Sequence, residues 1–203
     1  MERGKAMQER IIDKVMQHEV FFGKIKFKIV DLAFIGCLFA FAFMVRWKLM
    51  PIESADYWGF LEDWMKQIRD GGGFRSLGWQ ISNYSSPYMY LMCMVSYLTN
   101  NDLYGLKLVS VFFDYLASIA VFLIIYQITG RVRKSIMGMA ILLLSPTVIL
   151  DSAYWCQCDI IYTTFILFAI YYLFKNNSRG CLILVGISFA FKLQALFIVP
   201  FLI

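Results

Sequence analysis

Long apolar stretches separated by short polar segments dominate the pattern of this chain. At 1.5 Å per residue, helices of these lengths cross or nearly cross a hydrocarbon layer of about 30 Å. The pattern therefore predicts an all-α integral membrane bundle of about five transmembrane helices, in a membrane domain that covers residues 27–203. The helices are expected at 27–47, 103–128, 135–154, 159–174 and 180–203.

The polar stretch 48–102 is predicted to form one long outer loop that holds two helices on the membrane surface. Over 56–70, apolar and charged residues recur on opposite faces of a helix, as in helices that lie in a membrane interface. Ser54 is a suitable N-cap for this helix, and the glycines at 71–73 would end it.

The second loop helix, 87–98, is too short to span a membrane. The alternative, a transmembrane helix here, would reverse every later crossing and place Arg131, Arg133 and Lys134 on the outer side. Cytoplasmic loops carry the excess of Lys and Arg, so the pattern favours an interfacial helix.

Charge also gives the orientation. Seven of the 19 basic residues precede the first apolar stretch, which predicts a cytoplasmic N-terminus in a multi-pass protein of the plasma membrane. Segment 1–26 is expected to be cytoplasmic, either as an amphipathic helix on the membrane surface or as a solvated lead-in. The net charge of +5 is explained in this way without a nucleic-acid partner.

Composition excludes an ordinary soluble domain. Hydrophobic residues make up 60% of the chain, charged residues only 16%, and the mean hydropathy is +0.64. The five cysteines lie mostly in apolar stretches, where free cysteine behaves as a small hydrophobe, so no disulfide framework is expected. Cys156 and Cys158 have no matching Cys or His pair, so no metal site and no cofactor is predicted, although a divalent metal stays open.

Asp56 is the candidate for catalytic chemistry. It lies at the expected start of the helix 56–70, beside Tyr57 and Trp58. Desolvation by aromatic neighbours raises a carboxyl pKa toward working pH, which suits a general base. The alternative is a first-turn aspartate that only stabilises the helix N-terminus.

Two further polar groups interrupt the apolar pattern. The segment Tyr154–Asp159 places polar groups between two predicted spans, and polar backbone at that depth needs a cavity lined by protein or water. Lys192 and Gln194 lie within the predicted span 180–203, where an ionisable group is a functional candidate. Lys192 could instead pair with Asp114, or it could bind an anionic lipid phosphate.

Three separated blocks together resemble a known enzyme family and cover most of residues 54–203. They are Ser54-Ala55-Asp56-Tyr57 with Phe60, Leu61, Trp64, Gly72-Gly73-Phe74, Asn83-Tyr84 and Pro87-Tyr88-Met89-Tyr90-Leu91; Trp155-Cys156-Gln157-Cys158-Asp159 with Ile161-Tyr162; and Phe191-Lys192-Leu193-Gln194 with Phe197 and Pro200. The chain resembles the N-terminal portion of bacterial multi-pass glycosyltransferases of the GT-C type, in the group related to the second GPI mannosyltransferase.

This resemblance implies a cytoplasmic N-terminus, one span, a long outer loop with interfacial helices, and a catalytic base at the first-loop acidic residue, here Asp56. The family tends to have glycine at the position of Cys156 and proline at those of Asp63 and Ser86, which affects the expected shape of the pocket. Its enzymes also carry several more spans.

The function implied is transfer of a mannose-like hexose from a polyprenyl-phosphate donor to a glycan or lipid acceptor on the outer face, with Asp56 as general base. Two alternatives remain: a transporter or lipid-handling membrane protein, and an inactive fragment or subunit of a longer GT-C protein. The expected substrate-binding residues are Tyr57, Arg75, Asn83, Tyr84, Trp155, Gln157, Asp159, Lys192 and Gln194.

Overall fold

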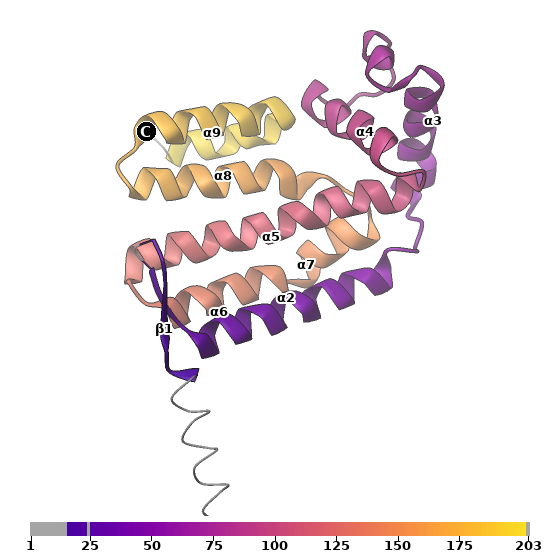
Figure 1. Cartoon of the computed structure of the whole chain (residues 1–203). Helices are drawn as coiled ribbons and strands as arrows, with labels where there is room; N and C mark the ends of the chain where they lie inside the picture. Colours follow the sequence, from indigo (N-terminus) through magenta and orange to yellow (C-terminus); the bar gives the residue numbers. More distant parts are fainter. Residues whose placement is uncertain (1–15, 24, 202–203) are drawn as a thin grey trace, which may run out of the picture.

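The structure, a computed structural model, describes residues 16–23 and 25–201. Helices α2, α5, α6, α8 and α9 run along a common direction, and α3 and α4 lie at one end of this bundle (Figure 1). The elements are β1 (Glu19–Phe22), β2 (Ile25–Lys28), α2 (Ile29–Leu49), the π-helix η1 (Tyr57–Leu61), α3 (Glu62–Asp70), the 3-10 helix η2 (Gly73–Gly78), α4 (Ser86–Leu98), α5 (Asp102–Thr129), α6 (Val132–Leu143), α7 (Pro146–Ile149), the π-helix η3 (Leu150–Tyr154), α8 (Asp159–Phe174), α9 (Ser178–Phe191) and the 3-10 helix η4 (Leu193–Phe201).

Long apolar helices are confirmed, and the structure limits how many could cross a membrane unaided. Among the described residues, α2 and α5 are long and apolar enough to do so. The segments Val132–Leu143 and Pro146–Tyr154 make a third if this pair, bent by 51°, counts as one span. Helices α8 and α9 are apolar but shorter, with 16 and 14 residues.

The N-terminal part of the chain departs from an all-α fold. Glu19–Phe22 and Ile25–Lys28 form an antiparallel hairpin in which Glu19 faces Lys28. The alternation of apolar and basic residues in Ile25–Lys28 is the period of a strand, which outweighed the helical pattern expected over 1–26. The prediction of an amphipathic helix is therefore wrong for residues 19–22 and 25–26, which form strands. The rest of the predicted segment up to residue 15, and residue 24, lie outside the described residues.

Two of the predicted long helices are broken. The helix expected at 135–154 ends at Leu143 and resumes at Pro146, because proline lacks a backbone donor and holds the residue before it, Ser145, out of the helical region. The helix expected at 180–203 ends at Phe191. Lys192 is extended, with φ −154° and ψ 130°, and η4 then runs back along α9 (Figure 1).

The two helices predicted in the loop 48–102 are present, and their apolar faces pack on protein. Leu61, Met65 and Ile68 belong to one buried cluster with residues of α4 and the start of α5. The apolar stripe of 56–70, which we expected to face a membrane, is thus largely the contact surface between α3 and its neighbours. Phe60 is the member of that stripe that stays exposed.

A buried ion pair ties α2 to α5. Arg46 donates through Nε to Asp114 Oδ2 at 2.8 Å and through an Nη to the Leu143 carbonyl at 2.9 Å. The Ser152 hydroxyl donates to the same Asp114 oxygen at 2.6 Å. The suggested pairing of Asp114 with Lys192 is therefore wrong, because Arg46 already occupies this carboxylate.

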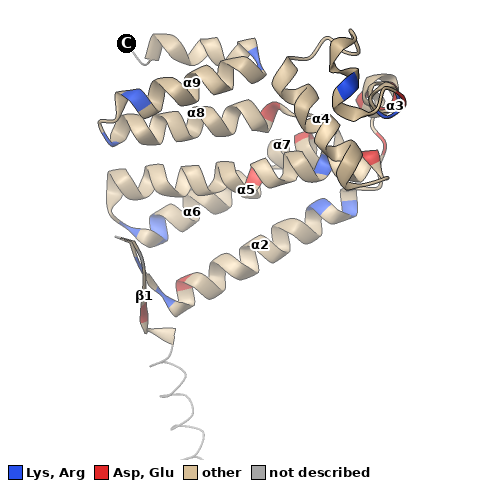
Figure 2. Cartoon of the chain, turned by 45° about the horizontal axis from the view of Figure 1, so that its top comes forward, with Lys and Arg blue, Asp and Glu red and all other residues tan. Residues whose placement is uncertain are grey.

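The two ends of the bundle differ in charge (Figure 2). Arg131 lies in the turn after α5, with Arg133 and Lys134 in the first turn of α6; Lys175 follows α8 directly, with Arg179 in the first turn of α9. Both turns lie at the end opposite α3 and α4, on the side of the hairpin (Figure 1). Basic and acidic residues are mixed at the other end.

We expect Asp114→Asn to lower the free energy of unfolding by about 3 kcal/mol or more, since it leaves the buried Arg46 charge uncompensated. The matched control is Asp31→Asn, whose partner Arg133 is exposed and 3.9 Å away; its cost should stay below about 1 kcal/mol. Reversible unfolding in detergent measures both. Equal losses would mean that the buried pair does not hold α2 in place.

Candidate functional site

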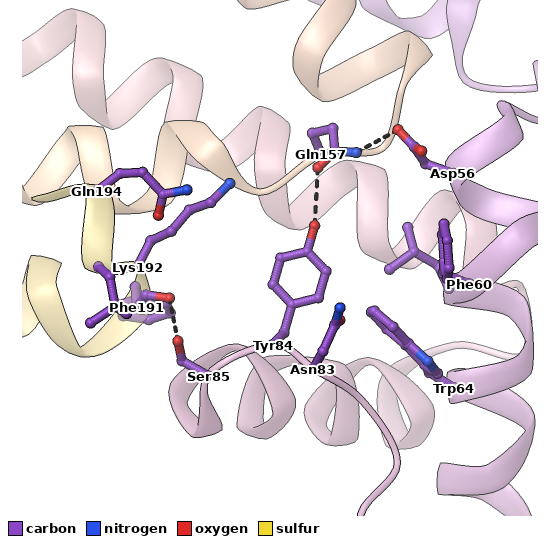
Figure 3. Close-up of a pocket in the computed structure, with 12 residues that line it drawn as sticks. Asp56, Phe60, Trp64, Asn83, Tyr84, Ser85, Gln157, Phe191, Lys192 and Gln194 are labelled. Atoms are coloured by element: carbon purple, nitrogen blue, oxygen red, sulfur yellow. Dashed lines mark hydrogen bonds between the residues drawn. The ribbon is translucent and has the colours of Figure 1, made fainter.

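A cavity of about 410 Å³ opens at the end of the bundle where α3 and α4 lie (Figure 3). Four separated parts of the chain meet there: the η1–α3 segment, the loop before α4, the turn before α8, and the break after α9. Its lining consists of Asp56, Phe60, Leu61, Trp64, Asn83, Tyr84, Ser85, Gln157, Phe191, Lys192, Leu193 and Gln194.

Ser54 fixes the segment that carries Asp56. Its hydroxyl accepts the Tyr57 N–H at 3.2 Å, so the predicted N-cap is confirmed. The same hydroxyl donates to the Trp155 carbonyl at 2.8 Å, which joins this segment to the turn before α8. Each of the joined segments adjoins a π-helix, η1 or η3, and π-helical turns are frequent at functional sites.

The Asp56 carboxylate is held by a hydrogen-bonded chain. Gln157 Nε2 donates to Asp56 Oδ2 at 2.5 Å, and the Tyr84 hydroxyl donates to Gln157 Oε1 at 3.2 Å. Burial raises the Tyr84 pKa, so the phenol stays protonated and remains a donor. Because the Asp56 carboxylate can only accept, the Gln157 amide turns its NH₂ toward Asp56, and its Oε1 is left to accept from Tyr84.

The other carboxylate oxygen of Asp56 is free. Oδ1 accepts no hydrogen bond from the part of the chain that the structure describes, and the side chain makes no capping bond to the helix N-terminus. The side chain thus makes no capping contact, although its place in the first helical turn also suits a favourable interaction with the helix dipole. One oxygen orients the group and the other is open to a ligand.

The opposite wall of the cavity carries a cation. Lys192 forms an ion pair with Asp159 at the start of α8, and its ammonium lies 5.9 Å from the centre of the Tyr162 ring. Gln194 lies beside Lys192, across the cavity from Asp56 (Figure 3). The Ser85 hydroxyl donates to the Phe191 carbonyl at 2.8 Å and so fixes the point where α9 ends.

An aromatic wall closes the side formed by η1 and α3. The Trp64 and Tyr84 rings meet edge-on with their centroids 5.3 Å apart, and the centroids of the Phe60 and Trp64 rings are 6.0 Å apart. The Phe60 side chain is largely exposed, so an apolar surface continues outward from the cavity. The cavity thus combines an acidic side, a cationic side and an apolar entrance.

Six of the ten predicted site residues line this cavity: Asp56, Asn83, Tyr84, Gln157, Lys192 and Gln194. Asp159 reaches it through Lys192. The other three lie elsewhere. Tyr57 lines a second cavity, and Arg75 is exposed on η2. The carbonyl of Trp155 accepts the hydrogen bond from Ser54, while its indole is exposed.

Two residues of α5 that bond to the backbone around the site were not predicted from the sequence. The Ser110 hydroxyl donates to the Gln157 carbonyl at 2.7 Å. Lys107, also on α5, is fully buried and donates to the carbonyls of Leu49, Met50 and Ile52. The position of Lys107 inside a predicted span could have marked it, because an ionisable group there is a functional candidate. Serine is common in apolar helices, so the sequence does not mark Ser110 in the same way.

Cys156 shapes the turn that presents Gln157. Its φ of 61° lies in the left-handed region, which only glycine adopts without strain. This is the position where the resembled family tends to have glycine. Burial raises the pKa of the Cys156 thiol to about 12, so it is not a nucleophile at neutral pH. Among the described residues, no group of three His, Cys, Asp or Glu side chains could hold a metal ion.

Comparison of the chain with known protein families, with characterised proteins and with solved structures finds no match.

We expect Cys156→Gly to change the free energy of unfolding by less than about 1 kcal/mol, because relief of left-handed strain offsets the lost thiol contacts. Cys156→Val should cost about 2 kcal/mol or more, since a β-branched residue resists this conformation. The control is Cys158→Gly: this residue has an ordinary φ of −109°, so the variant loses contacts with no relief. Chemical unfolding gives the three values, and a Cys156→Gly that is as damaging as Cys158→Gly would contradict the assignment of strain.

Proposed function

We propose that this chain is a membrane glycosyltransferase that moves a mannose-like hexose from a polyprenyl-phosphate donor to a glycan or lipid acceptor, with Asp56 as general base. One observation carries the proposal. The Asp56 carboxylate is oriented through one oxygen, open through the other, and faces Lys192 and Gln194 across a cavity with an apolar entrance. The three residue blocks of the resemblance all contribute to this cavity.

The proposed setting is the plasma membrane, with the basic turns of the bundle on the cytoplasmic side. Helices α2, α5, α8, α9 and the bent α6–η3 segment would cross it in alternating directions. The basic residues at 131–134 and 175–179 support this orientation, because cytoplasmic loops concentrate Lys and Arg. The cavity would then open at the outer face, with the polyprenyl chain against Phe60 and its apolar surroundings.

In the proposed reaction, Asp56 Oδ1 takes the proton of an acceptor hydroxyl as its oxygen attacks the anomeric carbon of the donor sugar. The bond between that carbon and the phosphate oxygen breaks, and the electron pair leaves with polyprenyl phosphate. One in-line displacement inverts the anomeric centre. Lys192 and Gln194 would stabilise the charge that develops on the phosphate, which is where fixed donors lower a barrier most. Arg75, which lies outside the cavity, has no part in this scheme.

The alternative of a transporter or lipid-handling protein was motivated by Lys192 and Asp114 as ionisable groups within predicted spans. Asp114 is buried in α5 and pairs with Arg46, whereas Lys192 lies at the break after α9 and pairs with Asp159. Because both charges have ion-pair partners within the bundle, the proposal favours sugar transfer over transport.

We expect Asp56→Asn to lower turnover by about 10²–10⁴-fold, the usual contribution of a general base. Purified protein is incubated with polyprenyl-phosphate mannose or glucose and an acceptor preparation, and release of polyprenyl phosphate is measured. Asp63→Asn removes the same charge from an exposed position of α3 outside the cavity and should keep wild-type turnover. Equal turnover in wild type and Asp56→Asn would remove Asp56 from the mechanism.

Tyr84→Phe should lower turnover by about tenfold while the protein stays folded, because the Gln157 amide loses the donor that fixes its orientation. Tyr90→Phe, an exposed tyrosine on α4 outside the cavity, is the control. The assay is the same release of polyprenyl phosphate. If both variants match wild type, the Tyr84–Gln157 bond does not position Asp56.

A further inference from the structure

A second cavity, of about 620 Å³, lies on the opposite face of η1 and α3 from the candidate site. Leu61 and Trp64 line the first cavity, whereas Tyr57, Glu62 and Lys66 line the second. The remaining walls come from the end of α3, from the segment that follows α2, and from the loop before α5 with its first residues. The complete lining is Pro51, Glu53, Tyr57, Glu62, Lys66, Arg69, Asp70, Asn100, Asn101, Asp102, Leu103 and Tyr104.

Tyr57 presents an unpaired hydroxyl to this cavity. The residue is only 7% exposed, and its hydroxyl makes no hydrogen bond within the described residues. Within that same part of the chain, Asp114 Oδ1 is the one side-chain oxygen or nitrogen that is both sealed from solvent and unpaired. The Tyr57 hydroxyl is therefore not sealed, and it reaches the cavity that it lines. A nearly buried hydroxyl without a partner is unfavourable unless something in the cavity bonds to it.

Carboxylates line the same cavity as this hydroxyl. After burial, the charges of Asp102, Glu62 and Glu53 raise the Tyr57 pKa to about 12, so the group stays a neutral donor. Arg69 neutralises Asp102 and also donates to the carbonyls of Ser96 and Thr99.

Three acidic residues of the lining, Glu53, Glu62 and Asp70, form no ion pair within the described part of the chain. Lys66 is the one lining cation besides Arg69, and it forms none either. The cavity therefore carries an excess of two negative charges: three free carboxylates against one free ammonium.

These carboxylates do not converge on a point, since no set of three acidic, His or Cys side chains among the described residues could hold a metal ion. Spread carboxylates beside the rings of Tyr57 and Tyr104 suit an extended organic cation better than a metal ion. We propose that this second cavity binds an organic ammonium compound, with the ammonium among Glu53, Glu62 and Asp70 and a polar atom of the ligand accepting from Tyr57. The proposal does not depend on sugar transfer.

The test compares two neighbouring carboxylates of α3. Spermidine is titrated by calorimetry into detergent-solubilised wild type, Glu62→Gln and Asp63→Asn. Glu62 lines the cavity and Asp63 does not, although both are exposed acids at adjacent positions. Glu62→Gln should weaken binding by at least about tenfold, as expected for loss of a charge-assisted contact, and Asp63→Asn by less than about threefold. Tyr57→Phe should also weaken binding.

A second arm separates a soluble ligand from a lipid headgroup. Unfolding midpoints are measured in nanodiscs of phosphatidylethanolamine and of phosphatidylcholine, for wild type and Glu62→Gln. A higher midpoint in phosphatidylethanolamine that Glu62→Gln abolishes identifies the headgroup; spermidine binding without this preference identifies a soluble ammonium compound. Either outcome supports the proposal. It is overturned if neither probe distinguishes wild type from Glu62→Gln, or if Asp63→Asn has the same effect as Glu62→Gln.

Discussion

The structure depends on two buried cations, Arg46 and Lys107, that tie α2 to α5. A buried charge is tolerated only when its partners are in place, so each cation fixes the elements around it. Arg46 sets the packing of α2 through Asp114, and Lys107 holds the carbonyls at the end of α2. The loop that leaves α2 therefore starts at a defined point, and Ser54 and Asp56 follow within a few residues.

The candidate site lies where regular helices are interrupted. Breaks in helices leave carbonyls that need donors in an apolar bundle, and serine hydroxyls supply them. Ser54 bonds the Trp155 carbonyl, Ser110 that of Gln157, and Ser85 that of Phe191. Each bond joins segments far apart in the sequence, so the contacts that satisfy the backbone also assemble the cavity.

The elements that can be predicted from the sequence are those whose ends carry a clear chemical signal. The helix expected at 103–128 is found at Asp102–Thr129, where Asn101 caps its start and Gly130, with φ 64°, ends it. The break at Lys192 was not predictable because apolar residues continue on both sides of it. Pattern likewise marked the polar residues at 56–57 but not their directions: successive helical residues differ by about 100°, so Asp56 and Tyr57 enter different cavities.

The π-helix η1 explains how one short segment serves two cavities. The Glu62 N–H bonds to the Tyr57 carbonyl, an i to i−5 bond that brings residues five apart onto one face. Tyr57 and Glu62 consequently line the same cavity, whereas an α-helix would align Tyr57 with Leu61. On the other face, Asp56, Phe60 and Trp64 keep a spacing of four and line the candidate site. The extra residue in this turn therefore keeps Tyr57 and Glu62 on the acidic cavity while Asp56 and Phe60 stay on the cavity that contains the proposed base.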